Sequence, residues 1–143
     1  MAFAEAAGPD FVAYQKRVVE NARALAAALV ARGFRLVSGG TDNHVMMVDV
    51  GAKGISGKDA EKRLDAVGLT VNKNTIPFDT RSPMVASGIR IGTPAVTTRG
   101  MGPSEMEAIA AAIARVLDSG DDPAAASEVK RSVAELCSAF PLV

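Results

Sequence analysis

The run SGIRIGTPA, residues 87–95, is the segment of this sequence whose residue types and spacing could best do chemistry. Side chains alternate between the two faces of a strand, so we expect Ile89 and Ile91 on one face and Arg90 on the other, between Gly88 and Gly92. Two neighbours without side chains leave room for another molecule, and the fork of arginine donors matches a carboxylate. The pattern also fits an arginine on a solvated face that pairs with a local acid, with the glycines marking a bulge or close backbone packing.

A second candidate segment, NKNTIPFDTRSPM, covers residues 72–84. The side chains of Asn72 and Asn74 combine a donor with an acceptor, which suits the mixed edge of a heterocycle, but asparagine is also an ordinary turn residue. We favour a turn for these residues and interpret Lys73 as a surface lysine. The stretch 73–87 shows neither helical nor strand periodicity, which predicts a long ordered loop.

The other reactive side chains form no catalytic set. His44 is the single histidine and has no second ligand at metal-binding spacing, so we expect a hydrogen-bonded structural histidine and no metal site. Cys137, the single cysteine, falls on the apolar side of a predicted helix, which is typical of a small buried side chain. We therefore expect binding groups but no catalytic residue.

Composition excludes several classes of protein. Of the 143 residues, 48% are hydrophobic, which is enough for a core without metal or disulfide cross-links. The 16 Lys and Arg balance the 16 Asp and Glu and are scattered, so we expect no nucleic-acid or membrane partner. No apolar run approaches the roughly 20 residues that span a bilayer, and no signal peptide is visible. We expect a cytoplasmic protein.

Periodicity predicts an α+β fold, a two-layer α/β arrangement in which a small, mostly antiparallel sheet packs against helices. The strand at 44–50 is apolar on both faces and should be covered on both. Asp10 should be the N-cap of the helix that begins there, an apolar stripe starts at Phe11, and Gly33 should end that helix. The predicted helices are 1–7, 10–32, 56–67, 103–117 and 123–139, and the predicted strands are 34–37, 44–50, 69–72 and 88–93.

Three runs, in this order and spacing, resemble the C-terminal domain of serine hydroxymethyltransferase: SGGTDNH at 38–44, TVNKN at 70–74 and SGIRIGTPA at 87–95. The opening FAEAAGPDFVAYQKRVVENARAL is similar to the family's helical link into that domain. The resemblance implies the small domain of the aminotransferase-like, fold-type I pyridoxal-phosphate enzymes. Residues 1–143 would form this single domain, with 1–32 as the link.

The resemblance also implies a function, namely the interconversion of serine and glycine with tetrahydrofolate as co-substrate and pyridoxal phosphate as cofactor. Arg90 corresponds to the family's arginine for the substrate carboxylate. Asn74 matches an asparagine at the folate pterin. Ser82, Pro83 and Met84 fall where the family's loop contacts folate, although bacterial members often carry Phe where this chain has Met84.

The chain departs from the family in what it lacks. It has no Thr-rich segment with the cofactor lysine, no Asp for the pyridine nitrogen and no His that stacks on the ring. We therefore expect a part of the enzyme that is inactive alone and acts with the missing large domain in a homodimer or homotetramer. Two alternatives stay open: a self-standing carboxylate-binding, folate-binding or assembly module, and another amino-acid enzyme of the same fold, against which the NKN and SGGTDNH runs argue.

Overall fold

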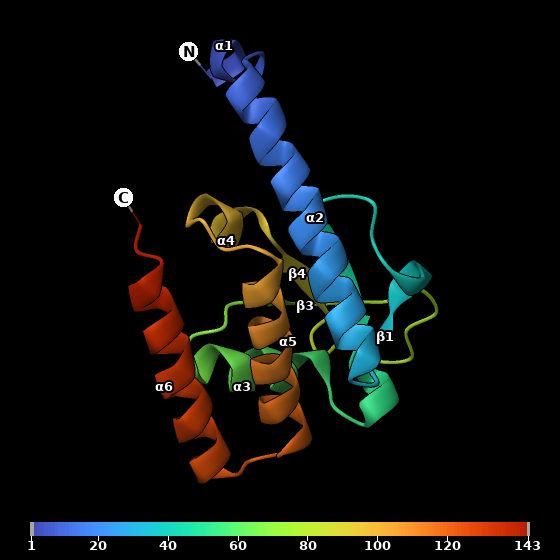
Figure 1. Cartoon of the computed structure of the whole chain (residues 1–143). Coiled ribbons are helices and arrows are strands. Elements are labelled where there is room, and N and C mark those ends of the chain that lie inside the picture. Colours follow the sequence, from blue (N-terminus) through green and yellow to red (C-terminus); the bar gives the residue numbers. More distant parts are fainter. Residues whose placement is uncertain (1, 143) are drawn as a thin grey trace.

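The computed structural model describes residues 2–142 and confirms the predicted α+β fold (Figure 1). The strands are β1 (Arg35–Leu36), β2 (Val45–Asp49), β3 (Asn72–Asn74) and β4 (Gly88–Gly92). The α-helices are α1 (Ala2–Ala6), α2 (Pro9–Ala31), α3 (Gly57–Ala66), α4 (Pro94–Thr98), α5 (Pro103–Asp118) and α6 (Pro123–Ala139). Two short 3-10 turns are η1 (Val37–Gly39) and η2 (Gly51–Lys53). No helix among these residues is long and apolar enough to cross a membrane.

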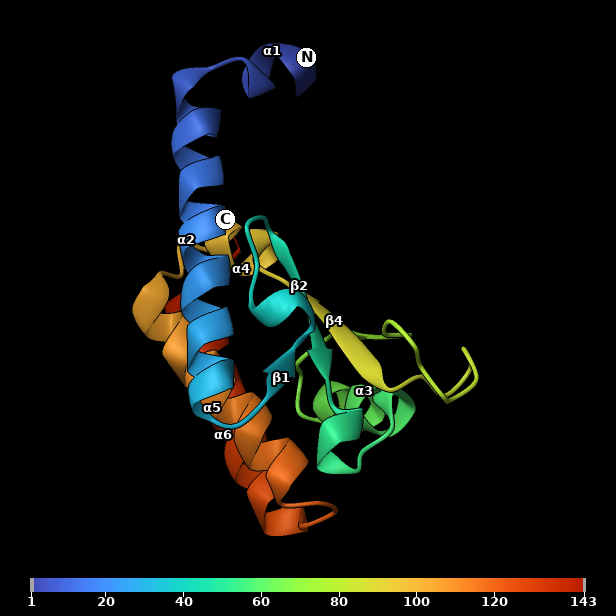
Figure 2. The same ribbon diagram turned by 90° about the vertical axis from the view of Figure 1, so that its right-hand side faces the viewer.

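The four strands form one antiparallel sheet in the order β1-β2-β4-β3. The predicted antiparallel character of the sheet is confirmed, and β1 pairs with β2 across the SGGTDN segment. Figure 2 shows α2, α5 and α6 on one side of the sheet. Ile89 and Val48 point to that side and are fully buried. The core therefore lies between the helices and one face of the sheet.

The opposite face of the sheet has no helical layer within residues 2–142. It carries the side chains of Val45, Met47, Asn72, Asn74 and Arg90, and we call it the bare face. Val45 and Met47 are half-buried there, although the rest of β2 is buried. The expected cover on both sides of this strand is thus absent from the described residues on one side.

The first residues of helix α2 extend beyond the core, so the start of its apolar stripe is not buried. Gly8 is the N-cap and Pro9 occupies the first turn, so the expectation that Asp10 caps the helix is wrong. Figure 1 shows the first turns of α2, together with α1, projecting past the other elements. Phe11 is accordingly 39% exposed, whereas Val18 is fully buried. The predicted stop is confirmed, because Gly33 follows the helix with a φ of 80°.

The third strand lies later in the chain than predicted. Residues 69–72 were expected to pair, but β3 covers Asn72–Asn74, so the NKN run is a strand and not a turn. Val71 is buried in the core without pairing in the sheet. A buried Val71 gives the sequence the apolar pattern of a strand at this position, but the pairing with β4 starts only at Asn72.

A buried polar network holds α4, which sequence periodicity did not predict, against α2. The Asn21 Nδ2 donates to Thr97 Oγ1 and to the Met101 carbonyl, both at 2.9 Å. Thr93 Oγ1 donates to the Val18 carbonyl at 2.9 Å. Because these side chains are buried and paired, they fix the position of the segment that follows β4.

Candidate functional site

Arg90 lies at the centre of β4, opposite Met47 on β2 and Asn72 on β3. Its neighbours in the strand, Ile89 and Ile91, are buried on the helical side, and Arg90 itself is exposed on the bare face. None of the ion pairs within residues 2–142 includes its guanidinium. The structure therefore presents a full set of arginine donors on this face.

A hollow of about 310 Å³ lies beside the Arg90 side chain, between β4, β2 and the loop before β2. Its volume lies at the lower end of the range for small-molecule sites, about 300 to 1,000 Å³. The loop has a fixed shape, since Thr41 Oγ1 donates to the Val45 carbonyl at 2.6 Å and Asn43 Oδ1 accepts from the Val45 N–H at 2.9 Å. Ser38 in this loop has a φ of 61°, a conformation that few residues other than glycine adopt.

The two glycines beside Arg90 do different things. A Cβ at Gly88 would lie 2.6 Å from Ile76 Cγ2, so this glycine allows close packing, and the expectation that it clears space for a ligand is wrong. At Gly92 the nearest atom to a Cβ would be the His44 carbonyl oxygen at 3.4 Å, an ordinary contact. Room beside the guanidinium thus exists toward Gly92 and the hollow, and not toward Gly88.

Asn74, the last residue of β3, lies on the bare face diagonally across the sheet from Arg90. Its Nδ2 donates to the Thr75 carbonyl at 2.8 Å and contacts Met47 Sδ at 3.6 Å. Met47 is in turn the cross-strand partner of Arg90. The sheet therefore brings these two predicted site residues onto one surface, with Met47 between them.

The other predicted contacts, Ser82, Pro83 and Met84, lie in the loop 75–87 and are exposed, Met84 to 74%. Figure 2 shows this loop projecting beyond the start of β4, on the side away from α2, α5 and α6. The hollow beside Arg90 is not lined by any of the three. Within residues 2–142 the fold does not gather them with Arg90.

Sequence reasoning missed Asp79, which organises the loop. Its carboxylate accepts the Ser87 Oγ–H at 2.6 Å and the N–H groups of Arg81 at 2.9 Å, Ser87 at 2.9 Å and Ile76 at 3.3 Å. The Ser87 hydroxyl above all, and then the Arg81 N–H, lower the pKa of Asp79 from 3.8 to about 2. The signal in the sequence is a single Asp two residues before Arg81, as in an Asx turn, and it does not reveal the partner eight residues further on.

The described residues do not fit pyridoxal phosphate by themselves. The hollow beside Arg90 is not lined by a lysine. Lys73 points to the helical side, where its Nζ lies 3.7 Å from Glu61 Oε2, and Lys53 pairs with Asp118 at 2.8 Å. The hollow beside Arg90 therefore offers no amine for a Schiff base with pyridoxal phosphate.

Neither the histidine nor the cysteine adds reactive chemistry to the described part of the chain. His44 is exposed, and only its backbone carbonyl accepts a hydrogen bond there, so the expectation of a hydrogen-bonded side chain is wrong. Cys137 is half-buried on α6. Residues 2–142 hold no group of three His, Cys, Asp or Glu side chains that could bind a metal ion.

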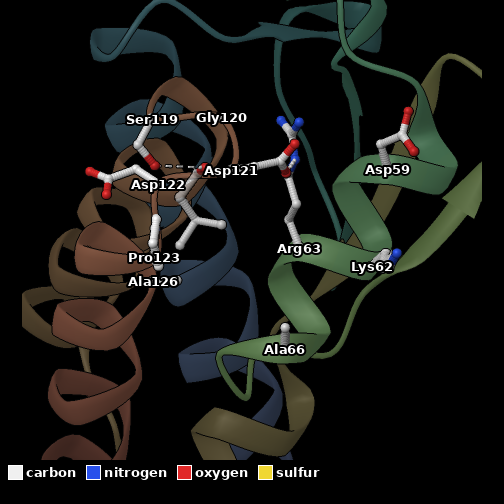
Figure 3. Close-up of a pocket in the computed structure, with 11 residues that line it drawn as sticks. Asp59, Lys62, Arg63, Ala66, Ser119, Gly120, Asp121, Asp122, Pro123 and Ala126 are labelled. Carbon is white, nitrogen blue, oxygen red and sulfur yellow. Dashed lines mark hydrogen bonds and ion pairs between the residues drawn. The ribbon is translucent and has the colours of Figure 1, made fainter.

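A separate hollow of about 360 Å³ lies on the helical side, between α3 and the turn from α5 to α6 (Figure 3). Arg63 on α3 points toward Asp121 in that turn, and Arg63 Nε pairs with Asp121 Oδ1 at 3.0 Å. Asp122 caps α6 by accepting the Ala124 N–H at 2.9 Å. Arg63 and Asp121 are thus paired with each other, and the hollow contains none of the predicted site residues.

Comparison with known protein families tests the resemblance that the three sequence runs suggested. The model of the family described as serine hydroxymethyltransferase matches residues 1–113, which is 113 of the 143 residues. The chain belongs to the serine hydroxymethyltransferase family. The match includes all of α2, the four strands and every residue of the bare face, and it ends within α5. The chain is thus a serine hydroxymethyltransferase-type domain, and the family is one of transferases.

Proposed function

We propose that this chain is the small domain of a serine hydroxymethyltransferase and that Arg90 binds the carboxylate of serine and glycine. The observation that carries the proposal is the exposed guanidinium, without an acidic partner in residues 2–142, beside a hollow of about 310 Å³. Two parallel N–H groups of arginine match the two oxygens of a carboxylate. Holding the carboxylate fixes the orientation of the substrate Cα relative to the groups that react.

The surface of the chain supports a partner that covers the bare face. Val45 and Met47 are half-buried apolar side chains on that face, and Phe3 and Phe11 are 93% and 39% exposed at the projecting end of the chain. Apolar surface of this kind is typical of a contact with another protein part. We propose that residues 1–143 form one domain, that 1–32 link it to the cofactor-binding part, and that this part covers the bare face.

Asn74 and the loop are the proposed folate contacts. Asn74 lies diagonally across the sheet from Arg90, so a ligand on the bare face could meet both side chains. Its amide offers a donor and an acceptor, as the edge of a pterin requires. This contact would be extended by Ser82, Pro83 and Met84 in the exposed loop that precedes β4.

Pyridoxal phosphate, which serves as an electron sink when bound, would be held by residues outside the described part of this chain. On this proposal the 143 residues supply binding and orientation, and they have no activity alone. The expected assembly of the intact enzyme, a homodimer or homotetramer in the cytoplasm, stays a prediction from the family.

The test replaces Arg90 in the complete enzyme, in which this domain is joined to the cofactor-binding part. Arg90→Ala removes the bidentate pair, and hydrogen bonds to a charged group contribute about 1.5 to 3 kcal/mol, so we expect the KM for serine to rise about 100-fold. Arg90→Lys should recover only part of this loss, since an ammonium lacks the fork. Arg131→Ala is the matched control, because Arg131 is an exposed arginine on α6.

A KM for serine in Arg90→Ala equal to that in Arg131→Ala would refute the proposal. Conversion of serine and tetrahydrofolate to glycine by the purified 143-residue chain would refute the division of labour between the two parts. Micromolar binding of serine by that chain, lost in Arg90→Ala, would instead favour a self-standing binding module.

A further inference from the structure

The loop 75–87 has no helix or strand, yet one carboxylate joins its two ends. Asp79 accepts from the Ile76 N–H at the start of the loop, from the Arg81 N–H in the middle and from both the N–H and the hydroxyl of Ser87 at the end. Four hydrogen bonds thus converge on two oxygen atoms. An ionised carboxylate can accept all four, because its two oxygens offer about four acceptor sites and it carries no N–H or O–H of its own.

Contacts outside the loop fix the same group of atoms to the sheet. Ser87 is 7% exposed and directly precedes β4, and Ile76 packs so closely on Gly88 that a Cβ there would lie 2.6 Å from its Cγ2. The Arg81 Nη1 donates to the Ile55 carbonyl at 3.0 Å, ahead of α3. Asp79 therefore joins residues of the loop that are themselves attached to β4 and to the segment before α3.

The exposed tip of the loop lies between two of these attachment points. Ser82, Pro83 and Met84 follow Arg81 and precede Ser87, and both of these residues donate a backbone N–H to Asp79. The Ser82 carbonyl accepts from the N–H groups of residues 85 and 86 at 2.9 and 2.8 Å, which closes the tip into a turn. The start of α3 holds the far end of this turn, because the N–H groups of Gly57 and Lys58 donate to the carbonyls of residues 86 and 85 at 3.0 and 2.9 Å. The Asp79 carboxylate holds the near end, at Arg81, and so contributes to the position of the tip relative to β4.

We propose that Asp79 is a positioning residue for the folate co-substrate, which holds the tip Ser82–Met84 at a fixed place relative to Arg90. It acts through the loop and touches neither substrate. The inference rests on the folate contacts proposed above. The lowered pKa agrees with it, since Asp79 is ionised, and accepts all four hydrogen bonds, throughout the neutral range.

Two substitutions of graded severity test this proposal. Asp79→Asn replaces one carboxylate oxygen by an NH₂ group, so at least one hydrogen bond is lost. The new NH₂ group also faces a backbone N–H, and two donors cannot pair with each other. Ser87→Ala removes only the hydroxyl and keeps the three backbone donors. The matched control is Asp65→Asn, the same chemical change at an exposed residue near the C-terminal end of α3, whereas the hydrogen bonds of α3 to the loop come from its first two residues.

The first measurement is amide hydrogen exchange of the 143-residue chain by NMR. In Asp79→Asn we expect the amides of Ile76, Arg81 and Ser87 to exchange at least tenfold faster than in Asp65→Asn, with the amides of β2 unchanged. The second measurement is steady-state kinetics of the complete enzyme. We expect Asp79→Asn to raise the KM for tetrahydrofolate about tenfold and Ser87→Ala about threefold, with the KM for serine unchanged.

The split between the two KM values separates positioning from a general loss of structure, which would raise both. Unchanged exchange in Asp79→Asn would overturn the assignment of the carboxylate as the anchor of the loop. Faster exchange with a tetrahydrofolate KM within twofold of Asp65→Asn would overturn its role toward folate. If Asp79→Asn does not fold, Ser87→Ala decides by the same criteria. The proposed function fails separately, through an Arg90→Ala variant that binds serine normally.

Discussion

Replacing Gly88 by alanine tests how closely β4 packs against the segment that follows β3. The added Cβ would lie 2.6 Å from Ile76 Cγ2, 2.9 Å from the Asn74 carbonyl oxygen and 3.2 Å from the Val48 carbonyl oxygen. Two of these atoms are backbone atoms in paired strands, so they cannot rotate away. The matched change Gly92→Ala, on the same face of the same strand, places its Cβ no closer than 3.4 Å to any atom beyond its neighbours.

The expected free energies follow from these distances. Overpacking by a methyl group destabilises a protein by about 1 to 3 kcal/mol, and replacing a strand glycine by alanine returns about 0.5 to 1 kcal/mol of backbone entropy. We expect Gly88→Ala to lower the free energy of unfolding by about 1 to 2 kcal/mol, and Tm by about 4 to 8 °C. Gly92→Ala should stay within about 0.5 kcal/mol of the unsubstituted chain.

Urea denaturation followed by circular dichroism measures both variants, and the m value shows whether each change acts on the folded state. A Gly88→Ala chain as stable as the original would refute the conclusion that this glycine serves packing. It would restore the simpler interpretation in which both glycines leave space beside Arg90.

Three further outcomes can be checked with the same chain. Asn21→Ala should lower the free energy of unfolding by about 2 to 3 kcal/mol in urea, because it leaves the buried Thr97 hydroxyl and the Met101 carbonyl without their donor. Arg90→Ala should change it by less than about 0.5 kcal/mol, since no ion pair within residues 2–142 is lost. Since the pKa of Asp79 is lowered from 3.8 to about 2 in the folded chain, its stabilising contribution is complete above 3.8 and is lost as the pH falls toward 2. The difference in stability between the original chain and Asp79→Asn should therefore shrink between pH 4 and pH 2, and a constant difference would contradict the hydrogen bonds assigned to this carboxylate.

Alternation along a strand was enough to predict on which face Arg90 lies, because Ile89 and Ile91 are apolar and must be buried, and the residue between them then points to the opposite face. The same reasoning failed for β3. Val71 fills the core from a segment that does not pair, and only the register against β4 shows that the strand starts at Asn72. Side-chain burial and backbone pairing are separate requirements, and the sequence pattern reports the first.

Long-range contacts account for what else the sequence did not predict. The periodicity of α2 runs through Phe11, but that part of the helix projects past the sheet and the other long helices, so the residue is partly exposed (Figure 1). Asp79 and Ser87 are eight residues apart in a segment without periodicity, and only the folded loop brings their side chains to 2.6 Å. A glycine in the sequence is compatible both with a close packing contact, as at Gly88, and with open space, so its role cannot be predicted from the sequence.

Because one layer of peptide separates the helical side of the sheet from the bare face, selection can change the two almost independently. Exchanges at Met47 or Asn72 alter the surface beside Arg90, while Val48, next to Met47 in β2, and Ile89, next to Arg90 in β4, go on filling the interior. A library randomised at those two outward positions should therefore yield mostly folded proteins. New preferences for other acids would then be reachable without passing through unstable ancestors.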